Sequence, residues 1–376
     1  MHRYHCRFQL WMAVAALAVS AAACGNKEAP ASAPAAEAKA PAAEAKAEPA
    51  AEAKAAPAAE AKPEAEAAKE DEGGAEAALP TGTPPPVSDF VISAKDAVAL
   101  HGKDNVVFVY AGAKAAYDKG HIPGSVHAFA HDMQYLDDVQ KCEGLPMCPD
   151  NAAKFIGGLG IGNDTQVIAY EDGKGVNESG VWFFLTLYGA KNVKMMEGGT
   201  AGWEAAGGKL DTTAVAPKAA TFTPAVNKDM VATRAEVEAA TKGGGALLLD
   251  ARHTLPEFTG TDLKDGMKNA TEHVTVKRGG HIPGAIFSPW TKYAGNKGGG
   301  AEGEMFRPTD KLRKQLAKLG KKGYAADKTM VTYCHVGLGR STFQYLGLRL
   351  AGHDKAKVYV GSWSEWGNSD LPVETE

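Results

Sequence analysis

The sequence has few of the features that mark a nucleic-acid-binding or membrane-spanning protein. Its 376 residues carry a formal net charge of only −4. Residues 25–86 hold twelve acidic residues and six lysines, so the rest of the chain is close to neutral. A chain without a basic excess offers no electrostatic footprint for nucleic acid, and we expect no such partner. The apolar run at residues 10–23 is shorter than a comfortable bilayer span.

Cysteine is also scarce, with five residues in the whole chain. Cys6 and Cys24 belong to the N-terminal segment. Cys142 and Cys148 are separated by five residues, a spacing that a turn can close, so we predict a disulfide under oxidising conditions. Two free thiols are the first alternative, and a metal pair is disfavoured because no histidine cluster lies beside them. Cys334 is then left without a partner. An unpaired thiol under oxidising conditions is either a disadvantage to the protein or a reactive group with a function.

The first residues have the pattern of an export signal. Arg3 and Arg7 precede the apolar run, which ends in small residues before Cys24. This order of charged, apolar and small residues predicts a signal peptide at residues 1–23. Such a signal can be removed by ordinary cleavage after Ala23, or it can be retained as an anchor. The next residue, Cys24, suggests lipid attachment as another outcome.

The stretch AAACG at residues 21–25 resembles the bacterial lipobox, in which the cysteine is lipidated and becomes the new N-terminus. Ala21 stands where leucine or valine is usual. By this resemblance Cys24 carries the lipid. Gly25 follows it instead of aspartate, as in lipoproteins sent to the outer membrane. We therefore expect an exported protein on the periplasmic side of a bacterial envelope, anchored to the outer membrane.

Residues 24–86 are built from alanine, glutamate, lysine and proline, and the unit AEAK occurs four times. Their side chains are too small or too polar to offset the entropy cost of ordering the chain. The interspersed prolines stop a helix from growing. We predict a disordered tether that holds a folded body away from a membrane.

The remaining chain repeats itself. GHIPGS at residues 120–125 is matched by GHIPGA at 280–285, and GGTAGW at 198–203 by GSWSEW at 361–366. The first glycine and the tryptophan are 83 residues apart in one copy and 86 in the other. Four landmarks at matched spacing indicate a duplicated domain. The HIPG stretches themselves have turn composition, and we expect them to be structural.

Strand and helix patterns alternate in both copies. Short apolar runs predict strands at residues 105–110, 166–170, 192–196, 246–250, 329–333 and 357–360. Helical periodicity occupies residues 152–159 and 311–319. This order predicts an α/β fold with two tandem domains, each a parallel sheet flanked by helices. The domains are residues 87–210 and 229–376, and the polar, proline-containing segment 211–228 is the linker.

Cys334 lies between a predicted strand and a predicted helix, residues 341–351. Gly337 and Gly339 let the intervening backbone bend so that its amides converge. Amides at a helix N-terminus form an anion site, and the same field lowers the pKa of a thiol. The alternative is a buried, inert cysteine. The glycines and the following arginine favour a reactive thiol beside a bound oxyanion.

The body, residues 88–376, resembles the tandem-domain rhodaneses, which are thiosulfate and 3-mercaptopyruvate sulfurtransferases. The resemblance rests on LLLDAR at 247–252, EFTG at 257–260, GGHIPGA and PW within 279–290, the Cys334 loop, and GSWSEWG at 361–367. It implies a non-catalytic first domain and a catalytic second domain. Glu171 stands in the first repeat where the second has its cysteine, and a carboxylate cannot carry sulfane sulfur.

The resemblance also implies a double displacement. The Cys334 thiolate takes sulfur from a small donor anion as a persulfide and passes it to cyanide or a thiol, without a metal or cofactor. Arg252 would bind the donor anion, with a structural ion pair as the alternative. The remaining predicted substrate-binding residues form the loop: His335, Val336, Gly337, Leu338, Gly339 and Arg340. We favour thiosulfate as the donor and expect a monomer.

The spacing of the Cys334 loop leaves an alternative function open. Arginine is the seventh residue of the loop counted from Cys334, and this C-x5-R-S spacing is similar to the phosphate loops of cysteine phosphatases and some arsenate reductases. Tyr333 in place of histidine before the cysteine argues against a phosphatase. A non-enzymatic module that binds a sulfur carrier or a partner protein is the third reading. Insertions at 261–278 and 293–304 are expected to border the site or to be mobile surface.

Overall fold

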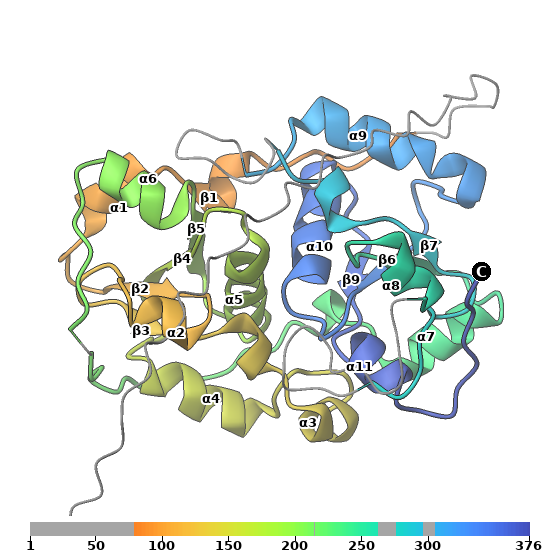
Figure 1. The fold of residues 1–376 in the computed structure, drawn as a ribbon, viewed down its shortest axis with the longest axis horizontal. Coiled ribbons are helices and arrows are strands. Elements are labelled where there is room, and N and C mark those ends of the chain that lie inside the picture. Colours follow the sequence, from red (N-terminus) through yellow and green to blue (C-terminus); the bar gives the residue numbers. More distant parts are fainter. Residues whose placement is uncertain (1–78, 214, 262–275, 296–304) are drawn as a thin grey trace, which may run out of the picture. The chain divides into compact units, whose positions relative to one another are not determined.

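Two parallel sheets organise the described part of the chain (Figure 1). The structure is a computed structural model that describes residues 79–213, 215–261, 276–295 and 305–376. These residues belong to one compact unit, Glu70–Glu376. The predicted signal peptide, Cys24, nearly all of the tether and most of both insertions lie outside the described residues. No helix within the described ranges has the length and apolar character needed to cross a membrane.

The first sheet has the order β1-β5-β4-β2-β3, and all of its pairs are parallel. Its strands are β1 (Val91–Ile92), β2 (Val106–Tyr110), β3 (Val126–His127), β4 (Gln166–Tyr170) and β5 (Asn192–Met196). The accompanying helices are α1 (Ala94–Leu100), α2 (Lys114–Tyr117), α3 (Leu136–Lys141), α4 (Pro149–Gly158), α5 (Val176–Leu187) and α6 (Gly199–Ala205), with 3-10 turns η1 (Val87–Asp89) and η2 (Ala130–Met133).

The second sheet has the order β7-β6-β8-β9, again with parallel pairs. Its strands are β6 (Leu247–Asp250), β7 (Ile286–Phe287), β8 (Met330–Tyr333) and β9 (Ala356–Val358). The helices are α7 (Arg234–Thr241), α8 (Leu255–Thr259), α9 (Thr309–Lys318), α10 (Arg340–Leu350) and α11 (Ser362–Trp366), with 3-10 turns η3 (Lys228–Met230), η4 (Trp290–Lys292) and η5 (Gly320–Lys322). Two parallel sheets with flanking helices are the predicted fold class.

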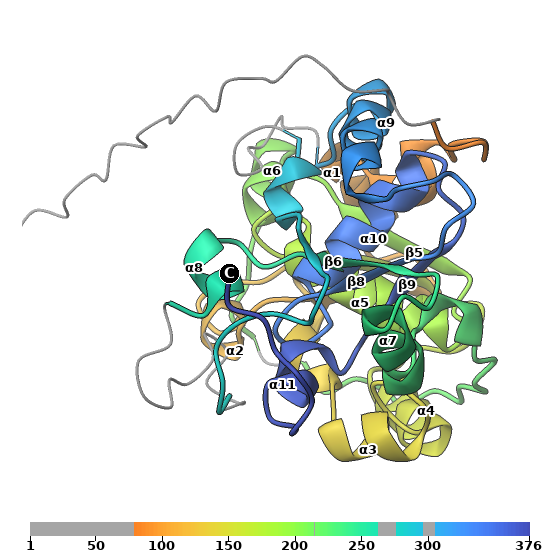
Figure 2. The ribbon, with the colours of Figure 1, turned by 90° about the vertical axis from the view of Figure 1, so that its right-hand side faces the viewer.

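Both faces of the second sheet are covered, which explains why its strands are almost continuously apolar. Alternate side chains of a strand point to opposite faces, so Leu248 and Val331 pack with α7 and α11. Leu247 and Leu249 pack on the other face, with α9 and α10. Figure 2 shows these helix pairs on the two sides of the sheet.

One apolar cluster joins the two domains. It contains residues of α5 and α10, and the rings of Phe183 and Tyr345 meet edge to face with centroids 5.4 Å apart. Serine and threonine hydroxyls between the same helices add hydrogen bonds, described below. The N-terminus of α10, where the Cys334 loop ends, therefore lies against the first domain.

The predicted strands agree closely with the observed ones in the first domain, where 166–170 and 192–196 are β4 and β5. The last strand was predicted at 357–360, but β9 ends at Val358. Beyond it, the Gly361 turn begins to bend the chain into α11. The two-residue strands β1, β3 and β7 were not predicted, because so short a run has no periodicity to recognise.

Cys142 and Cys148 form a disulfide in the first domain. This is the pairing that the spacing favoured. Cys148 is the N-cap residue of α4, and its N–H donates to Asp138 at 2.8 Å. The bridge therefore joins the end of α3 to the start of α4.

Candidate active site

Cys334 begins the loop that connects β8 to α10, and its side chain is buried. Its N–H donates to Ser362 Oγ at 3.1 Å, and its carbonyl accepts from the N–H of Trp363 at 3.0 Å. Ser362 is held in turn because its hydroxyl donates to the carbonyl of Tyr359 at 2.9 Å. The start of the loop is thus fixed by the GSWSEW motif, whose role sequence reasoning left unassigned.

The glycines of the loop are required by its path. Gly337 has φ +74°, and a Cβ there would lie 2.1 Å from the carbonyl oxygen of Val360. Gly339 has φ +123°, in the region that residues with a Cβ rarely adopt. Gly339 N–H donates to Thr342 Oγ1 at 3.0 Å, which fixes the loop to the first turn of α10. The bend predicted from the two glycines is present.

The middle of the loop leaves its amides available. Among the described residues, the backbone N–H groups of residues 335–338 have no protein acceptor. These groups lie before the N-terminus of α10, whose dipole adds positive potential. Unpaired amides in that position can bind a thiolate, a persulfide or an oxyanion.

The Cys334 thiol lies beside a hydroxyl. Sγ is 3.4 Å from Ser341 Oγ, and the same hydroxyl donates to the Gly337 carbonyl at 2.8 Å. A hydroxyl can turn its hydrogen to suit its surroundings, so Ser341 can donate to the sulfur when it becomes a thiolate. Hydrogen bonding to the charged form favours that form. Sequence reasoning did not single out Ser341.

Glu257 ties the loop to α8. One oxygen, Oε1, accepts from Arg340 Nη1 at 2.8 Å and lies 2.9 Å from His335 Nε2. The other oxygen, Oε2, accepts the N–H of Thr254 at 2.7 Å within the capping box that begins α8. The capping box orients the carboxylate, which then holds the side chains of both His335 and Arg340.

The partly buried position of Glu257 and His335 sets their protonation. Burial alone would raise the pKa of Glu257, but the hydrogen bond with His335 and the charge of Arg340 bring it below its usual range. Burial lowers the pKa of His335 and outweighs the opposite effect of Glu257. His335 is therefore neutral near pH 7, with Nε2–H donating to Glu257. Its buried Nδ1 has no hydrogen-bond partner in the described part of the chain.

The guanidinium of Arg252 is engaged by groups other than the Cys334 loop. This group donates to both carboxylate oxygens of Asp250 and to the carbonyl of Gly280, the last at 2.7 Å. It lies over the ring of Trp363, 4.9 Å from the centroid, and is only 1% exposed. These contacts are those of the structural ion pair that the sequence left as an alternative. The positive charge still reaches the site, because it helps to lower the pKa of His335. Direct binding of a donor by Arg252 stays a prediction.

The remaining predicted loop residues contribute backbone. Val336 and Leu338 are buried, with 2% and 0% exposure, so their side chains are core residues. Arg340 lies partly exposed at 27% of its side-chain surface, on the ion pair with Glu257. The structure therefore brings Cys334, His335 and Arg340 together and adds Glu257, Ser341 and Ser362. Glu257 had appeared only as part of a motif. Serines have no sequence signal that separates these two from others.

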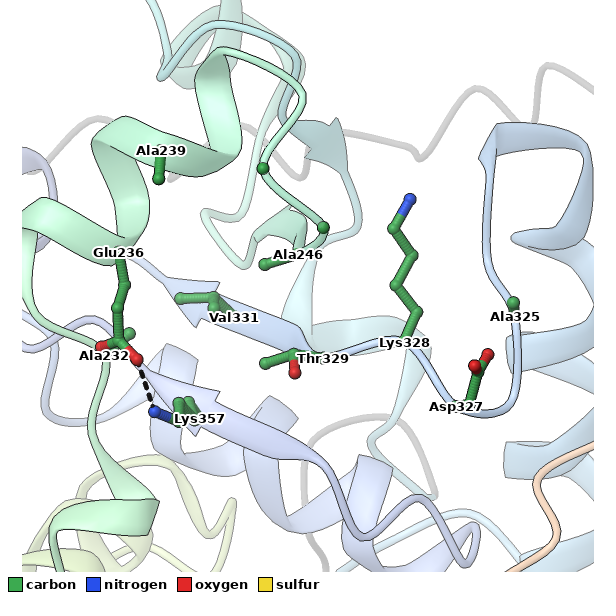
Figure 3. Close-up of a pocket in the computed structure, with 12 residues that line it drawn as sticks. Ala232, Glu236, Ala239, Ala246, Ala325, Asp327, Lys328, Thr329, Val331 and Lys357 are labelled. Carbon is green, nitrogen blue, oxygen red and sulfur yellow. Dashed lines mark hydrogen bonds and ion pairs between the residues drawn. The ribbon is translucent and has the colours of Figure 1, made fainter.

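A groove of about 570 Å³ lies elsewhere in the second domain (Figure 3). It is lined by Ala246, Thr329 and Val331, and by Lys357, whose Nζ lies 2.7 Å from Glu236. Residues before β6 and β8 form its walls, so it opens at the amino ends of the strands. Cys334 follows the carboxyl end of β8, where ligands of parallel sheets bind. The groove is not the thiol site.

The chain matches the family described as the rhodanese-like domain twice, at residues 93–206 and 233–369. The 3-mercaptopyruvate sulfurtransferase of Escherichia coli (strain K12) is 31% identical over 262 residues, which are 69% of this chain and 84% of the relative. The thiosulfate sulfurtransferase of Corynebacterium glutamicum is 33% identical over 267 residues, covering 69% of this chain and 81% of the relative.

Solved structures show the same fold. The crystal structure of SseA, a 3-mercaptopyruvate sulfotransferase from Escherichia coli, has a TM-score of 0.58 at 23% identity and covers 73% of this chain and 98% of its own. The anaerobic ergothioneine biosynthesis enzyme from Chlorobium limicola has a TM-score of 0.60 at 21% identity, with coverage of 76% and 70%. At these identities the structural likeness establishes the fold alone.

Proposed function

The chain belongs to the rhodanese family, and from this premise we propose that it is a sulfurtransferase whose Cys334 carries sulfane sulfur as a persulfide, with thiosulfate as the donor. Relatives named as thiosulfate and 3-mercaptopyruvate sulfurtransferases support the reaction class. One observation carries the mechanism: Cys334 begins a loop in which the amides of residues 335–338 have no acceptor in the part of the protein that the structure describes.

In the first step, the Cys334 thiolate attacks the outer sulfur of thiosulfate. A new S–S bond forms on Cys334, the S–S bond of thiosulfate breaks, and its electron pair leaves with sulfite. The negative charge moves from the thiolate to the terminal persulfide sulfur. The free amides of the loop lie where they can stabilise the charge before and after the transfer.

In the second step, a thiophilic acceptor attacks the terminal sulfur of the persulfide. With cyanide, a C–S bond forms, the S–S bond breaks, and its electron pair returns to Cys334 as the thiolate. Thiocyanate leaves and the enzyme is restored. Neither step changes the proton count when cyanide is the acceptor, so no general acid is required.

Four side chains have roles around the thiol. The Ser341 hydroxyl donates a hydrogen bond to the Cys334 thiolate and so stabilises the ionised form of the side chain. Arg340 brings positive charge to the rim of the loop for the donor anion. Glu257 positions Arg340 and His335. Burial keeps His335 neutral although Glu257 opposes this, so Arg340 is the cation of the loop. The buried guanidinium of Arg252 adds positive charge near His335, and direct contact between Arg252 and the donor stays a prediction.

The relatives do not share one donor, since the two quoted names specify thiosulfate and 3-mercaptopyruvate. A dianion such as thiosulfate gains more from Arg340 and from unpaired amides than a monoanion does. Thiosulfate is therefore the donor favoured here, as it was from the sequence.

The test is the intact mass of residues 79–376 and of the full chain after brief incubation with thiosulfate. A gain of one sulfur atom, about 32 Da, that cyanide removes is the result expected of a cysteine nucleophile. Cys334→Ser is the control and should gain nothing. The same measurement with 3-mercaptopyruvate ranks the two donors.

Absence of any sulfur gain in wild-type protein with either donor would contradict the proposal. The C-x5-R-S spacing and the Ser341–Cys334 contact would then favour an oxyanion substrate, to be tested with a phosphate ester and with arsenate. A binding module would keep its partner in Cys334→Ser, whereas the enzyme would lose turnover completely.

We also propose that the mature protein is tethered at the periplasmic face of the outer membrane through lipid on Cys24. The motif AAACG and the Ala-Glu-Lys-Pro segment support this proposal. Expression in a Gram-negative host, followed by membrane fractionation, tests it. Cys24→Ser should move the protein from the membrane pellet to the soluble fraction, and an unchanged pellet would contradict the anchor.

A further inference from the structure

The first domain has a counterpart of the Cys334 loop. Glu171 follows Tyr170 at the end of β4, as Cys334 follows Tyr333 at the end of β8, and each loop leads into the helix that packs against the other domain. This is the edge at which parallel sheets bind ligands. The second domain has there a thiol and amides that lack an acceptor within the described ranges, whereas the first domain has carboxylates.

Three carboxylates converge in this loop. One oxygen from each of Glu171, Asp172 and Glu178 lies within 4.8 Å of the other two. Calcium binds oxygen ligands at about 2.3–2.6 Å, so two ligands of one ion are at most about 5 Å apart. The spacing of the three groups therefore fits a single ion without a rearrangement of the backbone.

Glu178 is the second observation. Its side chain is 0% exposed, and Oε1 accepts the N–H of Gly173 at 3.2 Å. Its other oxygen, Oε2, is buried and has no hydrogen-bond partner among the described residues. Buried carboxylate oxygens are ordinarily satisfied, because an unpaired one loses its hydration without compensation. An oxygen of this buried group belongs to the carboxylate cluster.

The neighbouring groups do not neutralise the cluster. Lys174 Nζ lies 2.7 Å from Asp172, but both side chains are about half exposed (50% and 43%), so the pair is screened and weak. Asn177 donates to Glu171 at 2.8 Å and brings no charge. Carboxylates this close to one another repel when they are ionised, and a bound cation would offset that repulsion.

We propose that Glu171, Asp172 and Glu178 form a binding site for a hard divalent cation, with Ca²⁺ as the ion that fits best. All three ligands are oxygens, which favours Ca²⁺ or Mg²⁺ over softer metals. The site is open to solvent at Asp172, so water can complete the six to eight ligands that Ca²⁺ takes. Sequence reasoning expected no metal. The proposed cation would occupy in the first domain the place where the second domain binds an anion.

The cation stabilises the fold and is independent of sulfur transfer. It would neutralise the loop that leads into α5, the helix that packs on α10. The test uses the full chain, first stripped with EDTA, with CaCl₂ or MgCl₂ added alone. We expect the Tm to rise saturably with Ca²⁺ and less with Mg²⁺, because binding to the folded state alone raises stability with concentration.

Terbium is the second probe, because it replaces Ca²⁺ at oxygen sites and is excited through nearby tyrosine. Tyr110, the last residue of β2, pairs in register with Tyr170 of β4, the residue directly before Glu171. We expect terbium luminescence on excitation of tyrosine, and its loss when Ca²⁺ is added in excess. This readout does not depend on stability or on turnover.

Two variants separate a cation site from a merely structural cluster. Glu178→Gln should lose the Ca²⁺-dependent rise in Tm and bind Ca²⁺ at least tenfold more weakly. In EDTA its Tm should equal or exceed that of wild type, because the repulsion is removed. Asp172→Asn, at an exposed position, should weaken binding without any risk to folding. Glu204→Gln, an exposed carboxylate of α6, is the control and should bind Ca²⁺ as wild type does.

Three results would overturn the proposal. The first is wild-type protein with neither a Tm shift nor terbium luminescence at millimolar cation, which would show that the three carboxylates do not bind a cation. The second is equal binding by Asp172→Asn and wild type. The third is preference for Mg²⁺, which would exclude Ca²⁺ as the ion. Persulfide formation on Cys334 is measured separately, so failure of one proposal leaves the other intact.

Discussion

The hydroxyl of Ser179 in α5 lies 2.9 Å from the hydroxyl of Thr342 in α10, so a hydrogen bond joins the two domains next to the thiol loop. Ser179 Oγ is also 3.1 Å from the carbonyl oxygen of Gly339. Thr342 Oγ1 accepts the N–H of the same glycine. The last glycine of the loop is therefore held from both domains, and the first domain is part of the scaffold of the candidate site.

Ser179→Ala should lower both stability and the rate of persulfide formation. The lost hydrogen bond is buried, and a bond of this kind contributes about 1 kcal/mol to unfolding free energy. The rate should fall a few-fold because Gly339 loses one of its supports. Thermal unfolding and single-turnover mass spectrometry measure the two effects.

A double-mutant cycle checks that this effect runs through Thr342. Ser179→Ala and Thr342→Val should be less than additive, since each removes the same bond. Ser179→Ala combined with Thr241→Val, at the end of α7 on the opposite face of the second sheet, should be additive. Equal non-additivity in both cycles would contradict a specific interdomain bond.

Gly337→Ala should abolish sulfur transfer. The added Cβ would lie 2.1 Å from the Val360 carbonyl, so the loop must move and its amides no longer converge. Gly207→Ala is a matched control, because Gly207 also has a positive φ (+92°) but open space around the added Cβ. The control should lose about 1 kcal/mol of stability from backbone strain and keep its activity. Similar activities for the two variants would exclude close packing of the loop as a requirement.

Ser341→Ala should slow the reactions of the Cys334 thiolate. Without the hydroxyl at 3.4 Å, the thiolate loses one hydrogen bond, and a hydrogen bond to a charged group contributes about 1.5–3 kcal/mol. Alkylation by iodoacetamide at pH 7 should therefore slow by about tenfold. Ser341→Thr keeps the hydroxyl and should restore much of the wild-type rate. An unchanged alkylation rate in Ser341→Ala would remove Ser341 from the mechanism.

Glu257 should make stability depend on acid pH. The pKa of this carboxyl in the folded protein lies below the ordinary value of 4.5, because of the hydrogen bond with His335 and the charge of Arg340, although burial opposes them. Its stabilising contribution is therefore complete above about pH 4.5 and is lost as the pH falls through the folded-state pKa. Glu257→Gln should be less stable than wild type at pH 7, and the difference should shrink toward pH 3.

The measurement is Tm between pH 3 and pH 7 for both proteins. His335, whose pKa is also lowered, adds a separate decline that begins near its ordinary value of 6.5 as the pH falls. His335→Gln distinguishes this decline from that of Glu257. A constant difference between Glu257→Gln and wild type over the whole range would show that the carboxylate keeps its unfolded pKa.

Local sequence determined much of the fold. β4 and β5 were predicted to the residue because they are short apolar runs bounded by turn residues, and such runs in parallel sheets are buried on both faces. The repeated motifs located both domains at once. Two further features could be predicted from local sequence because each depends on only a few neighbouring residues. These are the disulfide between Cys142 and Cys148 and the bend at the glycines after Cys334.

Other features depended on contacts between distant segments. Glu257 precedes His335 by 78 residues and Arg340 by 83, so no local pattern joins them. Ser179 and Thr342 are 163 residues apart and belong to different domains. Arg252 follows a strand as expected, but only the fold decides that its charge turns inward to Asp250 and Trp363.

The sequence by itself determined the two sheets, the repeat and the place of the candidate reactive cysteine, since propensity, periodicity and turn chemistry are properties of neighbouring residues. Only the tertiary structure decided which side chains surround the thiol, and that the matching place in the first domain gathers Glu171, Asp172 and Glu178. Side-chain direction at the end of a strand depends on what packs against it. For this protein that packing comes from the other domain and from segments about eighty residues away.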